Sequence, residues 1–359
     1  MKSKIKVVYY IATLEAGGAE RVSINMIRQL DKDKFDIYLI LVENRGPFLD
    51  LVPEYVNLIN LNAKKTVYSI LKLRKEIEKI KPDIIYSTLF RTHIAIDLAL
   101  SFFKIKPKII LRSPTSPKIL LERGELNWLM KLLIEKAYRN ADKILAQTPQ
   151  MREEISKYHN ININKIETFL NPLDTKLIEK KINNSSNPFD KDKINIVSAG
   201  RLSSVKGFDI LLYAFQLVIK ENNNFFLHII GRDGGEKSKL EKIAKELSID
   251  NYVKFWGFQD NPYKFFYYSD LFVLSSIREG LPNAVLENLY LKKPIVATRC
   301  ISFMDKLINN GVNGFLVEVN DYISLSKAIL NYKKLNSKSN QILDYTSMDI
   351  NSLLMGLIK

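Results

Sequence analysis

The 359-residue sequence contains a single cysteine, Cys300, and only three histidines. One cysteine excludes an intramolecular disulfide, which fits a reducing compartment. No stretch approaches the roughly 18 uncharged apolar residues that a membrane-spanning helix needs, so no transmembrane helix is predicted. The apolar run from Val7 to Leu14 is too short for a signal peptide, and no small-residue cleavage site follows it before Glu15. We therefore interpret this run as a first buried strand and expect a cytoplasmic protein.

Acidic residues are fewer than basic ones. The chain has 39 Asp and Glu against 54 Lys and Arg, which gives a formal net charge of +15 spread along its length. Such a charge favours anionic partners, namely phosphorylated substrates, anionic lipid or nucleic acid. No nucleic-acid-binding module is recognisable, so nucleic acid is not expected as a partner. The sequence also offers no convincing cluster of metal-ligating residues.

Apolar runs alternate with helical patterns along the chain. Leu271 to Leu274 is an unbroken apolar run, which is typical of a strand buried on both faces of a parallel sheet. A polar loop from Ser275 to Gly280, a helix and the apolar run from Ile295 to Ala297 follow it. This alternation predicts an α/β fold with doubly wound parallel sheets. Other strands are expected at residues 5–12, 35–42, 56–61, 83–87, 108–111, 141–148 (the last of the first half), 194–197, 225–230 and 253–258.

Two carboxylates lie in the otherwise hydrophobic segment after residue 270. Glu279 precedes the predicted helix and Glu287 lies within it, four residues after Asn283 and so on the same helix face. A helix start at the carboxyl end of a parallel strand favours a bound phosphate. Carboxylates would repel that phosphate, so we interpret them as acceptors of hydrogen bonds from ribose or sugar hydroxyls. The alternative is a capping Glu279 and a solvated Glu287.

Basic and glycine residues follow other predicted strands. Arg201 and Lys206 come directly after the strand at 194–197, where cations can hold a departing phosphate. Gly17 and Gly18 follow the first strand and would let the backbone approach a ligand closely. They do not form the G-x-G-x-x-G fingerprint, so a classical NAD site is unsupported. The alternatives are two surface cations and a plain strand-to-helix turn.

The segment from Ile119 to Arg139 combines an apolar stripe and Trp128 with flanking Lys and Arg side chains. Such a helix can lie on an anionic membrane surface. More often, a stripe of this kind simply packs on the sheet. Both interpretations stay open, and together they raise peripheral contact with an anionic membrane as a hypothesis.

The segment from Glu279 to Glu287 resembles the E-x7-E motif of the family 4 retaining glycosyltransferases. Residues 200–207, Gly-Arg-Leu-Ser-Ser-Val-Lys-Gly, resemble the family's G-R-L-x-x-x-K-G pattern, and residues 17–20 resemble its G-G-A-E opening. The resemblance implies the GT-B architecture: two Rossmann-like doubly wound domains that face each other across a cleft. The polar segment from Lys180 to Lys193 marks the boundary. We therefore expect an acceptor-side domain at 1–180, a nucleotide-sugar-binding domain at 190–338, and a segment at 339–359 that packs back on the first domain.

The resemblance also implies roles for individual residues. Glu279 would contact hydroxyls of the donor sugar, and Glu287 would bind the ribose of the nucleotide. Arg201 and Lys206 would neutralise the departing diphosphate, so these two cations and Glu279 form the expected catalytic set. The other residues expected to bind the donor are Gly17, Gly18, Gly231, Gly280, Leu281 and Asn283.

The implied reaction moves a sugar from a nucleotide diphospho-sugar to a hydroxyl of a glycan or lipid-linked glycan, with retention at the anomeric carbon. A UDP-sugar is the first expectation and a GDP-sugar the alternative, and the sugar is a hexose or N-acetylhexosamine. No cofactor and no metal are expected, because Arg201, Lys206 and helix N-termini can neutralise the diphosphate. The expected setting is capsule, lipopolysaccharide or other surface polysaccharide biosynthesis, on the inner face of the cytoplasmic membrane.

Some residues depart from the family pattern. Many relatives have a histidine after the strand that here ends at Arg112-Ser113, and only His93, one helix earlier, lies nearby in sequence. Residues 299–306 replace a loop that usually contains glycine and ends in Glu. Two other functions therefore stay open: a non-catalytic nucleotide-binding relative, and a nucleotide-sugar epimerase of the same architecture. A glycosidase pair is disfavoured, because eight residues of helix rise about 12 Å, whereas glycosidase carboxyls lie roughly 5 to 9.5 Å apart.

Overall fold

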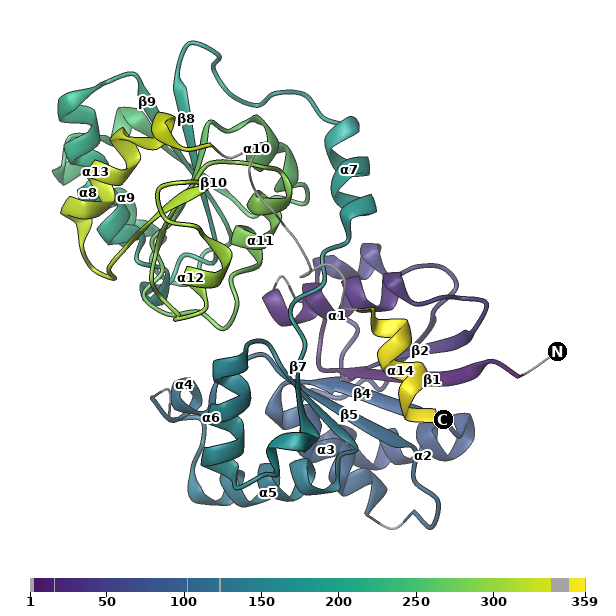
Figure 1. The fold of residues 1–359 in the computed structure, drawn as a ribbon. Helices are drawn as coiled ribbons and strands as arrows, with labels where there is room; N and C mark the ends of the chain where they lie inside the picture. Colours follow the sequence, from purple (N-terminus) through teal and green to yellow (C-terminus); the bar gives the residue numbers. More distant parts are fainter. Residues whose placement is uncertain (1–2, 16, 102, 123, 337–348, 359) are drawn as a thin grey trace. The chain divides into compact units, whose positions relative to one another are not determined.

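The computed structural model describes residues 3–15, 17–101, 103–122, 124–336 and 349–358. The chain divides into two compact units, which we call the first unit (Met1–Asp174 with Asp344–Lys359) and the second unit (Thr175–Leu343). Each unit is built on one parallel sheet with helices packed against it (Figure 1). The predicted fold class, two doubly wound α/β domains, is confirmed. The boundary expected between residues 338 and 339 lies outside the described residues.

The sheet of the first unit has seven parallel strands in the order β3-β2-β1-β4-β5-β6-β7. Strand order reverses between β1 and β4, so the loops after these two strands lead away in opposite directions. The prediction that residues 141–148 hold the last strand of this half is wrong, because the three-residue β7 follows and is too short to leave an apolar pattern. The strands are β1 (Ile5–Ile11), β2 (Phe35–Leu41), β3 (Asn57–Asn60), β4 (Ile84–Thr88), β5 (Lys108–Ser113), β6 (Lys143–Ala146) and β7 (Ile166–Thr168).

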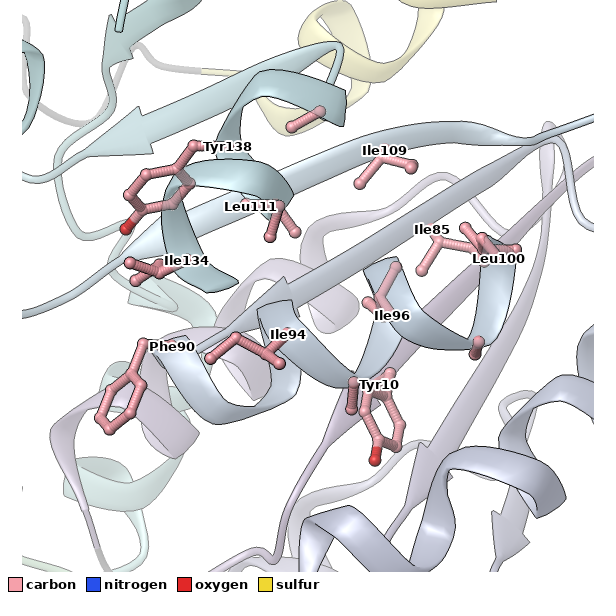
Figure 2. Close-up of a cluster of buried hydrophobic side chains, with 14 of the residues drawn as sticks. Tyr10, Ile85, Phe90, Ile94, Ile96, Leu100, Ile109, Leu111, Ile134 and Tyr138 are labelled. Atoms are coloured by element: carbon pink, nitrogen blue, oxygen red, sulfur yellow. The ribbon is translucent and has the colours of Figure 1, made fainter. Parts of the chain in front are cut away.

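The helices of the first unit connect these strands. They are α1 (Gly18–Gln29), η1 (Pro47–Leu51), η2 (Thr66–Ser69), α2 (Ile70–Ile80), α3 (Phe90–Leu100), α4 (Pro117–Glu122), α5 (Trp128–Asn140), α6 (Pro149–His159), η3 (Ile163–Lys165) and α14 (Ile350–Ile358). The core below the sheet contains Ile85 and Leu111 from the central strands, with Ile96 of α3 and Ile134 of α5 packed against them (Figure 2). Each such aliphatic side chain contributes about 2 kcal/mol through its removal from water.

The single helix suggested by the apolar and basic stripe at 119–139 consists of two helices, α4 and α5. Ile134 and Tyr138 of α5 are buried against the sheet, whereas Trp128 is 74% exposed and Leu132 is 53% exposed. Packing on the sheet therefore accounts for the second half of the stripe. The first turns of α5 carry apolar side chains that the fold leaves in solvent.

The second unit has six parallel strands in the order β10-β9-β8-β11-β12-β13, with the reversal between β8 and β11. Its strands are β8 (Ile194–Ala199), β9 (Phe225–Ile230), β10 (Val253–Gly257), β11 (Leu271–Leu274), β12 (Ile295–Thr298) and β13 (Gly314–Val317). Its helices are α7 (Thr175–Asn183), η4 (Ser204–Lys206), α8 (Phe208–Glu221), α9 (Lys237–Glu246), η5 (Asp250–Tyr252), α10 (Tyr263–Tyr268), α11 (Asn283–Tyr290), α12 (Met304–Leu307), α13 (Tyr322–Leu330) and η6 (Tyr332–Lys334).

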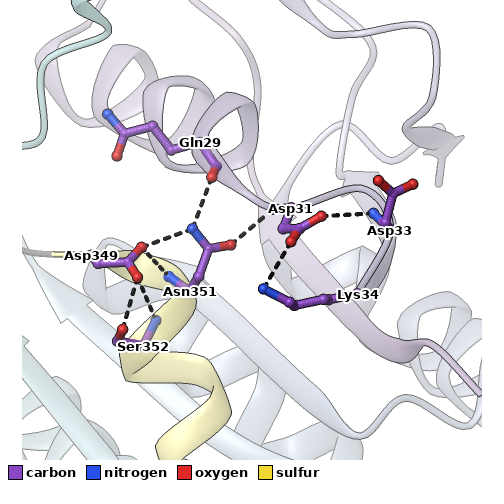
Figure 3. Close-up of polar contacts among 7 residues, drawn as sticks. All are labelled: Gln29, Asp31, Asp33, Lys34, Asp349, Asn351 and Ser352. Atoms are coloured by element: carbon purple, nitrogen blue, oxygen red, sulfur yellow. Dashed lines mark hydrogen bonds and ion pairs between the residues drawn. The ribbon is translucent and has the colours of Figure 1, made fainter. Parts of the chain in front are cut away.

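The end of the chain returns to the first unit as α14, which lies beside α1 (Figure 1). Asp349 accepts hydrogen bonds from the backbone N–H groups of Asn351 and Ser352 and so caps the start of α14. The Asn351 side chain donates to the carbonyl of Gln29 at 3.0 Å and accepts from the N–H of Asp31 at 2.8 Å (Figure 3). A side-chain amide thus satisfies backbone groups at the carboxyl end of α1.

A buried histidine links two strands of the second unit. His228 accepts a hydrogen bond at Nδ1 from the Trp256 indole at 3.1 Å, and its Nε2 lies 2.9 Å from the Asn195 side-chain oxygen. These bonds suit the neutral ring, whose Nε2–H donates while Nδ1 accepts. Burial of the ring lowers the pKa of His228 to about 3, with a smaller contribution from Lys254. In the folded protein the ring stays neutral at pH values where it would be protonated in water.

We expect this depressed pKa to make the second unit less stable in mild acid. The unfolded chain protonates His228 below a pKa of about 6.5, so His228 alone should lower the free energy of unfolding by about 2 kcal/mol between pH 7.5 and pH 5. His228→Gln keeps a donor and an acceptor without titrating, so the free energy of unfolding of this variant should fall by about 2 kcal/mol less than that of the wild type over the same pH range. Urea unfolding followed by Trp256 fluorescence in a Trp128→Phe background measures that free energy at each pH.

The matched control for this experiment is His159→Gln, which replaces a buried histidine of the first unit. The pKa of His159 is also lowered, to about 4, mainly by burial. This variant should leave the pH slope reported by Trp256 unchanged. A His228→Gln protein with the wild-type slope would contradict the assignment.

Candidate functional site

The residues predicted to bind a donor gather at the carboxyl edge of the second sheet, where the strand order reverses. Gly200 and Arg201 directly follow β8, Gly231 follows β9, and Glu279 lies in the loop that follows β11. Parallel α/β sheets bind ligands at this point because the loops from neighbouring strands diverge there and leave a crevice. The sequence predicted a donor site in these loops, and the topology places the loops next to one another.

An ion pair joins two of these loops. Lys206 Nζ lies 2.6 Å from Glu279 Oε1, and the Ser276 hydroxyl donates to the same oxygen at 2.8 Å. The two charged side chains are 22% and 13% exposed, so the pair is largely shielded from water and its attraction is stronger than that of a surface pair. Both bonds use Oε1. Ser276 was not predicted, and its place in the polar loop, two residues after β11, is the signal that could have found it.

A glycine holds the Lys206 loop against the Glu279 loop. Gly207 has a φ of +59°, and a Cβ at this position would lie 2.2 Å from the Ser275 carbonyl oxygen. The Ser275 hydroxyl donates to the Lys206 carbonyl at 3.0 Å, and the Ile277 N–H donates to the Val205 carbonyl at 2.9 Å. These contacts require a residue without a side chain at position 207, and they fix the backbone that carries Lys206.

A second close backbone contact lies beneath the site. Gly231 has a φ of +151°, and a Cβ there would lie 1.8 Å from the Gly200 carbonyl oxygen. A Cβ on Gly200 would in turn lie 3.2 Å from the Cδ and Cε atoms of Lys206, so the lysine stem passes directly over Gly200. Arg201 is exposed, and its Cγ would lie 2.9 Å from a Cβ on Gly234. The turn after β9 therefore supports both cations.

The second predicted carboxylate lies on α11. Glu287 is only 5% exposed, so its alternative interpretation as a solvated carboxylate is wrong. Asn283 is the first residue of α11, one turn before Glu287 on the same face, and no side chain caps the helix start at Pro282. Gly280 and Leu281 lie between Glu279 and this helix start. The start of α11 therefore follows the Glu279 loop closely in the chain.

Thr298, the last residue of β12, and Cys300 in the loop that follows complete the surroundings of the ion pair. Thr298 donates its hydroxyl to the Ser276 carbonyl at 2.5 Å and so holds the loop that carries Glu279. Burial, with a smaller contribution from the nearby Glu279 carboxylate, raises the pKa of the Cys300 thiol to about 12. Cys300 is thus a neutral thiol next to the ion pair and is unsuited to act as a nucleophile. This loop is the one that departs from the family pattern, and no sequence motif indicated that it would lie here.

The first unit contains the remaining predicted residues. Gly17 is the N-cap of α1 and Gly18 its first residue, both after β1 and so in a different compact unit from Lys206 and Glu279. His93 of α3 is 1% exposed, and burial lowers its pKa to about 3, so it is a neutral core residue beside Tyr138. Arg112, at the strand end where relatives have a histidine, is fully buried and donates to the Asn171 side chain.

In the described part of the chain, no group of three or more His, Cys, Asp or Glu side chains is arranged to hold a metal ion. None of the described helices has the length and apolar character needed to cross a bilayer.

Two parallel sheets in Rossmann order, each in its own α/β unit, are the fold of the GT-B glycosyltransferases. Two family profiles match the chain: Glycosyl transferases group 1 at residues 179–347, and Glycosyltransferase Family 4 at residues 16–177. An uncharacterised glycosyltransferase from Haemophilus influenzae is 31% identical over 331 residues, which cover 90% of this chain and 89% of that protein. The chain belongs to the family 4 glycosyltransferases.

Other relatives have more specific names. A Campylobacter jejuni protein named N-acetylgalactosamine-N,N'-diacetylbacillosaminyl-diphospho-undecaprenol 4-alpha-N-acetylgalactosaminyltransferase is 28% identical over 334 residues, covering 90% of this chain and 89% of that protein. Among solved structures, Anabaena HepE in complex with UDP and glucose superposes with a TM-score of 0.80 at 18% identity, over 99% of both chains. At that identity, the likeness to HepE shows the fold.

We expect Gly231→Ala to destabilise the second unit by about 3 kcal/mol or more, because its methyl group would overlap the Gly200 carbonyl. Gly235→Ala is the matched control, since Gly235 also has a positive φ, +97°, but a Cβ there meets no atom within 4 Å. The control should cost about 1 kcal/mol from backbone conformation alone. Urea unfolding followed by Trp256 fluorescence measures both, and equal losses would show that the close contact is unimportant.

Proposed function

We propose that this glycosyltransferase moves a hexose or N-acetylhexosamine from a UDP-sugar to a hydroxyl of a lipid-linked glycan, with retention at the anomeric carbon and without a metal. The observation that carries the proposal is the shielded pair of Lys206 and Glu279 at the reversal point of the second sheet. A nucleotide diphospho-sugar needs a cation near its diphosphate and an acceptor near its sugar hydroxyls. This pair supplies both in one place.

In the proposed mechanism, two cations act on the diphosphate and one carboxylate acts on the donor sugar. The Lys206 ammonium and the Arg201 guanidinium lie at the diphosphate and stabilise the negative charge that develops as the bond to the sugar breaks. Glu279 keeps Lys206 oriented through Oε1 and accepts a hydrogen bond from a donor-sugar hydroxyl through Oε2. Because two cations and the N–H groups at the start of α11 carry the compensating charge, the mechanism needs no metal.

The nucleotide half of the donor is assigned to α11 and its loop. Glu287 is buried and lies one turn beyond Asn283, which suits a carboxylate that accepts hydrogen bonds from the two ribose hydroxyls. The backbone N–H groups of Gly280 and Leu281 would contact the diphosphate. Gly17, Gly18 and Gly231 let backbone approach the donor closely, as their sequence context indicates.

Relatives support UDP as the carrier and a lipid-linked acceptor. Anabaena HepE structures contain UDP or UDP-glucose. An Escherichia coli relative, 24% identical over 344 residues, is named UDP-Gal:alpha-D-GlcNAc-diphosphoundecaprenol alpha-1,3-galactosyltransferase. Formation of an α linkage from an α-linked nucleotide sugar is retention, which is the outcome we propose here. A GDP-sugar remains the alternative donor.

The proposed setting is surface polysaccharide synthesis on the cytoplasmic face of the membrane, either capsule or lipopolysaccharide. Relatives from Rhizobium meliloti are named as lipopolysaccharide core biosynthesis glycosyltransferases, at 29% identity over 194 residues and 33% over 138 residues. Peripheral membrane contact through the exposed first turns of α5 belongs to this proposal.

We expect UDP, and not GDP, to raise the melting temperature of the protein in a thermal-shift titration. Glu287→Ala should abolish the shift, because the ribose would lose its carboxylate acceptor. Glu241→Ala, an exposed residue of α9 in the same unit, is the matched control and should keep the shift. No shift with any nucleoside diphosphate would remove the main support for a transferase, and a shift with GDP alone would replace the proposed donor.

Lys206→Ala should lower kcat for sugar transfer by about 10²- to 10³-fold, because the leaving diphosphate loses a shielded cation. Lys220→Ala, on the far end of α8, should leave kcat unchanged. Release of UDP from a panel of UDP-sugars gives the rate, and NMR of the product gives the anomeric configuration. An inverted product would contradict retention, and a C4- or C2-epimerised UDP-sugar without transfer would indicate an epimerase.

A further inference from the structure

The first unit contains a cavity of about 780 Å³ that the proposed donor site does not use. Every lining residue belongs to the first unit, from Ala12 to Leu133. Thr13 follows β1, Glu43 follows β2, Lys64 follows β3 and Arg91 follows β4, so the cavity lies at the carboxyl edge of the sheet. This edge is where parallel α/β sheets bind ligands, and the cavity has the size of a small-molecule site.

The walls of this cavity are apolar. Ile94, Ala95 and Leu98 line it from α3, and Met130 and Leu133 line it from α5. These side chains lie between two helices that pack on the same face of the sheet. These five side chains favour a hydrocarbon over a sugar, because they have no group that pairs with a hydroxyl. Thr13, Thr66 and Asn127 are the uncharged polar residues of the lining.

The rim of the cavity is basic. Lys64, Lys65 and Arg91 are exposed, and among the described residues none of these three side chains forms an ion pair. Arg45 also lines the cavity but pairs with Glu15 at 3.3 Å and Glu43 at 3.6 Å, and Glu125 is the other acidic lining residue. Three uncompensated cations beside an apolar chamber complement a ligand that has an anionic group next to a hydrocarbon.

Exposed apolar side chains lie on the same elements that wall the cavity. Val67 of η2 lines it and is 61% exposed, and Leu71 at the start of α2 is 73% exposed. On the other wall, Trp128 and Leu132 of α5 are mostly in solvent. Apolar residues exposed together in this way favour contact with a hydrocarbon surface. A ligand chain anchored in a bilayer would find apolar surface both outside and inside the cavity.

From these features we propose that the cavity binds the lipid part of the acceptor: a phosphate or diphosphate at Lys64, Lys65 and Arg91, joined to a hydrocarbon chain held between α3 and α5. The inference rests on the proposed function and names the class of its acceptor. Charge complementarity selects this occupant, because a neutral glycan would use neither the three cations nor the apolar walls. The sugar attached to the phosphate would then extend from the rim.

Farnesyl diphosphate is a suitable probe, because it combines a diphosphate with an apolar chain and is soluble enough for calorimetry. The titration is done with full-length protein saturated with UDP, so that the donor site is already occupied. We expect farnesyl diphosphate to bind, and farnesol and inorganic pyrophosphate to bind about tenfold more weakly or worse, because each lacks one half of the recognised group.

Two variants test the position of the probe. Arg91→Glu reverses an exposed rim charge without disturbing the core, and Leu98→Trp fills the apolar chamber. Each should weaken binding of farnesyl diphosphate by about tenfold or more and leave the UDP thermal shift intact. Lys79→Ala, an exposed cation of α2 outside the cavity, is the matched control and should bind like the wild type.

Several results would overturn the proposal. Binding of farnesyl diphosphate to UDP-free protein but not to UDP-saturated protein would place it in the donor site, and equal binding by wild type, Arg91→Glu and Leu98→Trp would place it elsewhere. Co-sedimentation with phosphatidylglycerol vesicles without any binding of the probe would make the exposed patch a membrane surface only. If UDP failed to raise the melting temperature of the wild type, the proposed function itself would be refuted. Failure of the lipid-site proposal and failure of the proposed function are therefore distinguishable.

Discussion

Burial of both sheets on two faces is the constraint on which the rest of the structure depends. Parallel strands whose faces are covered place few polar side chains in solvent, so the polar groups that a ligand can reach gather at the edge where the strands end. In the second unit this edge holds Lys206 and Glu279, and in the first unit it holds the basic rim of the cavity. Both candidate sites therefore follow from one packing rule applied to two sheets.

The shielded ion pair needs a backbone that brings two loops together more closely than side chains would allow. Gly207 and Gly231 supply this approach, since a methyl group at either position would overlap a neighbouring carbonyl oxygen. Ser275, Ser276 and Thr298 then tie the loops after β8 and β11 and the end of β12 to one another. The geometry of Lys206 is thus set by residues that carry no charge, a common way to preorganise an electrostatic site.

Helix α1 anchors both segments through which the chain leaves and re-enters the first unit. Asn25 and Gln29 donate to the carbonyls of Pro172 and Leu173, and Arg28 pairs with Asp174 at 2.5 Å, at the last residue before the second unit begins. The carboxyl end of the same helix holds α14 through Asn351 (Figure 3). One amphipathic helix therefore fixes the exit and the return of the chain, and the glycines Gly17 and Gly18 form its N-terminus.

The sequence by itself determined the fold class, the boundaries of most strands and the residues of the donor-site motifs, because apolar runs and glycine-bounded turns are local patterns. It did not determine β7, which is too short, or the break between α4 and α5. Only the tertiary structure decided that Lys206 meets Glu279, that Cys300 and Thr298 lie beside them, and that His93 is a core residue. It alone brought Lys64 and Arg91 to one rim. Each of these facts depends on which strand ends are neighbours, and strand order is a long-range property that no local pattern encodes.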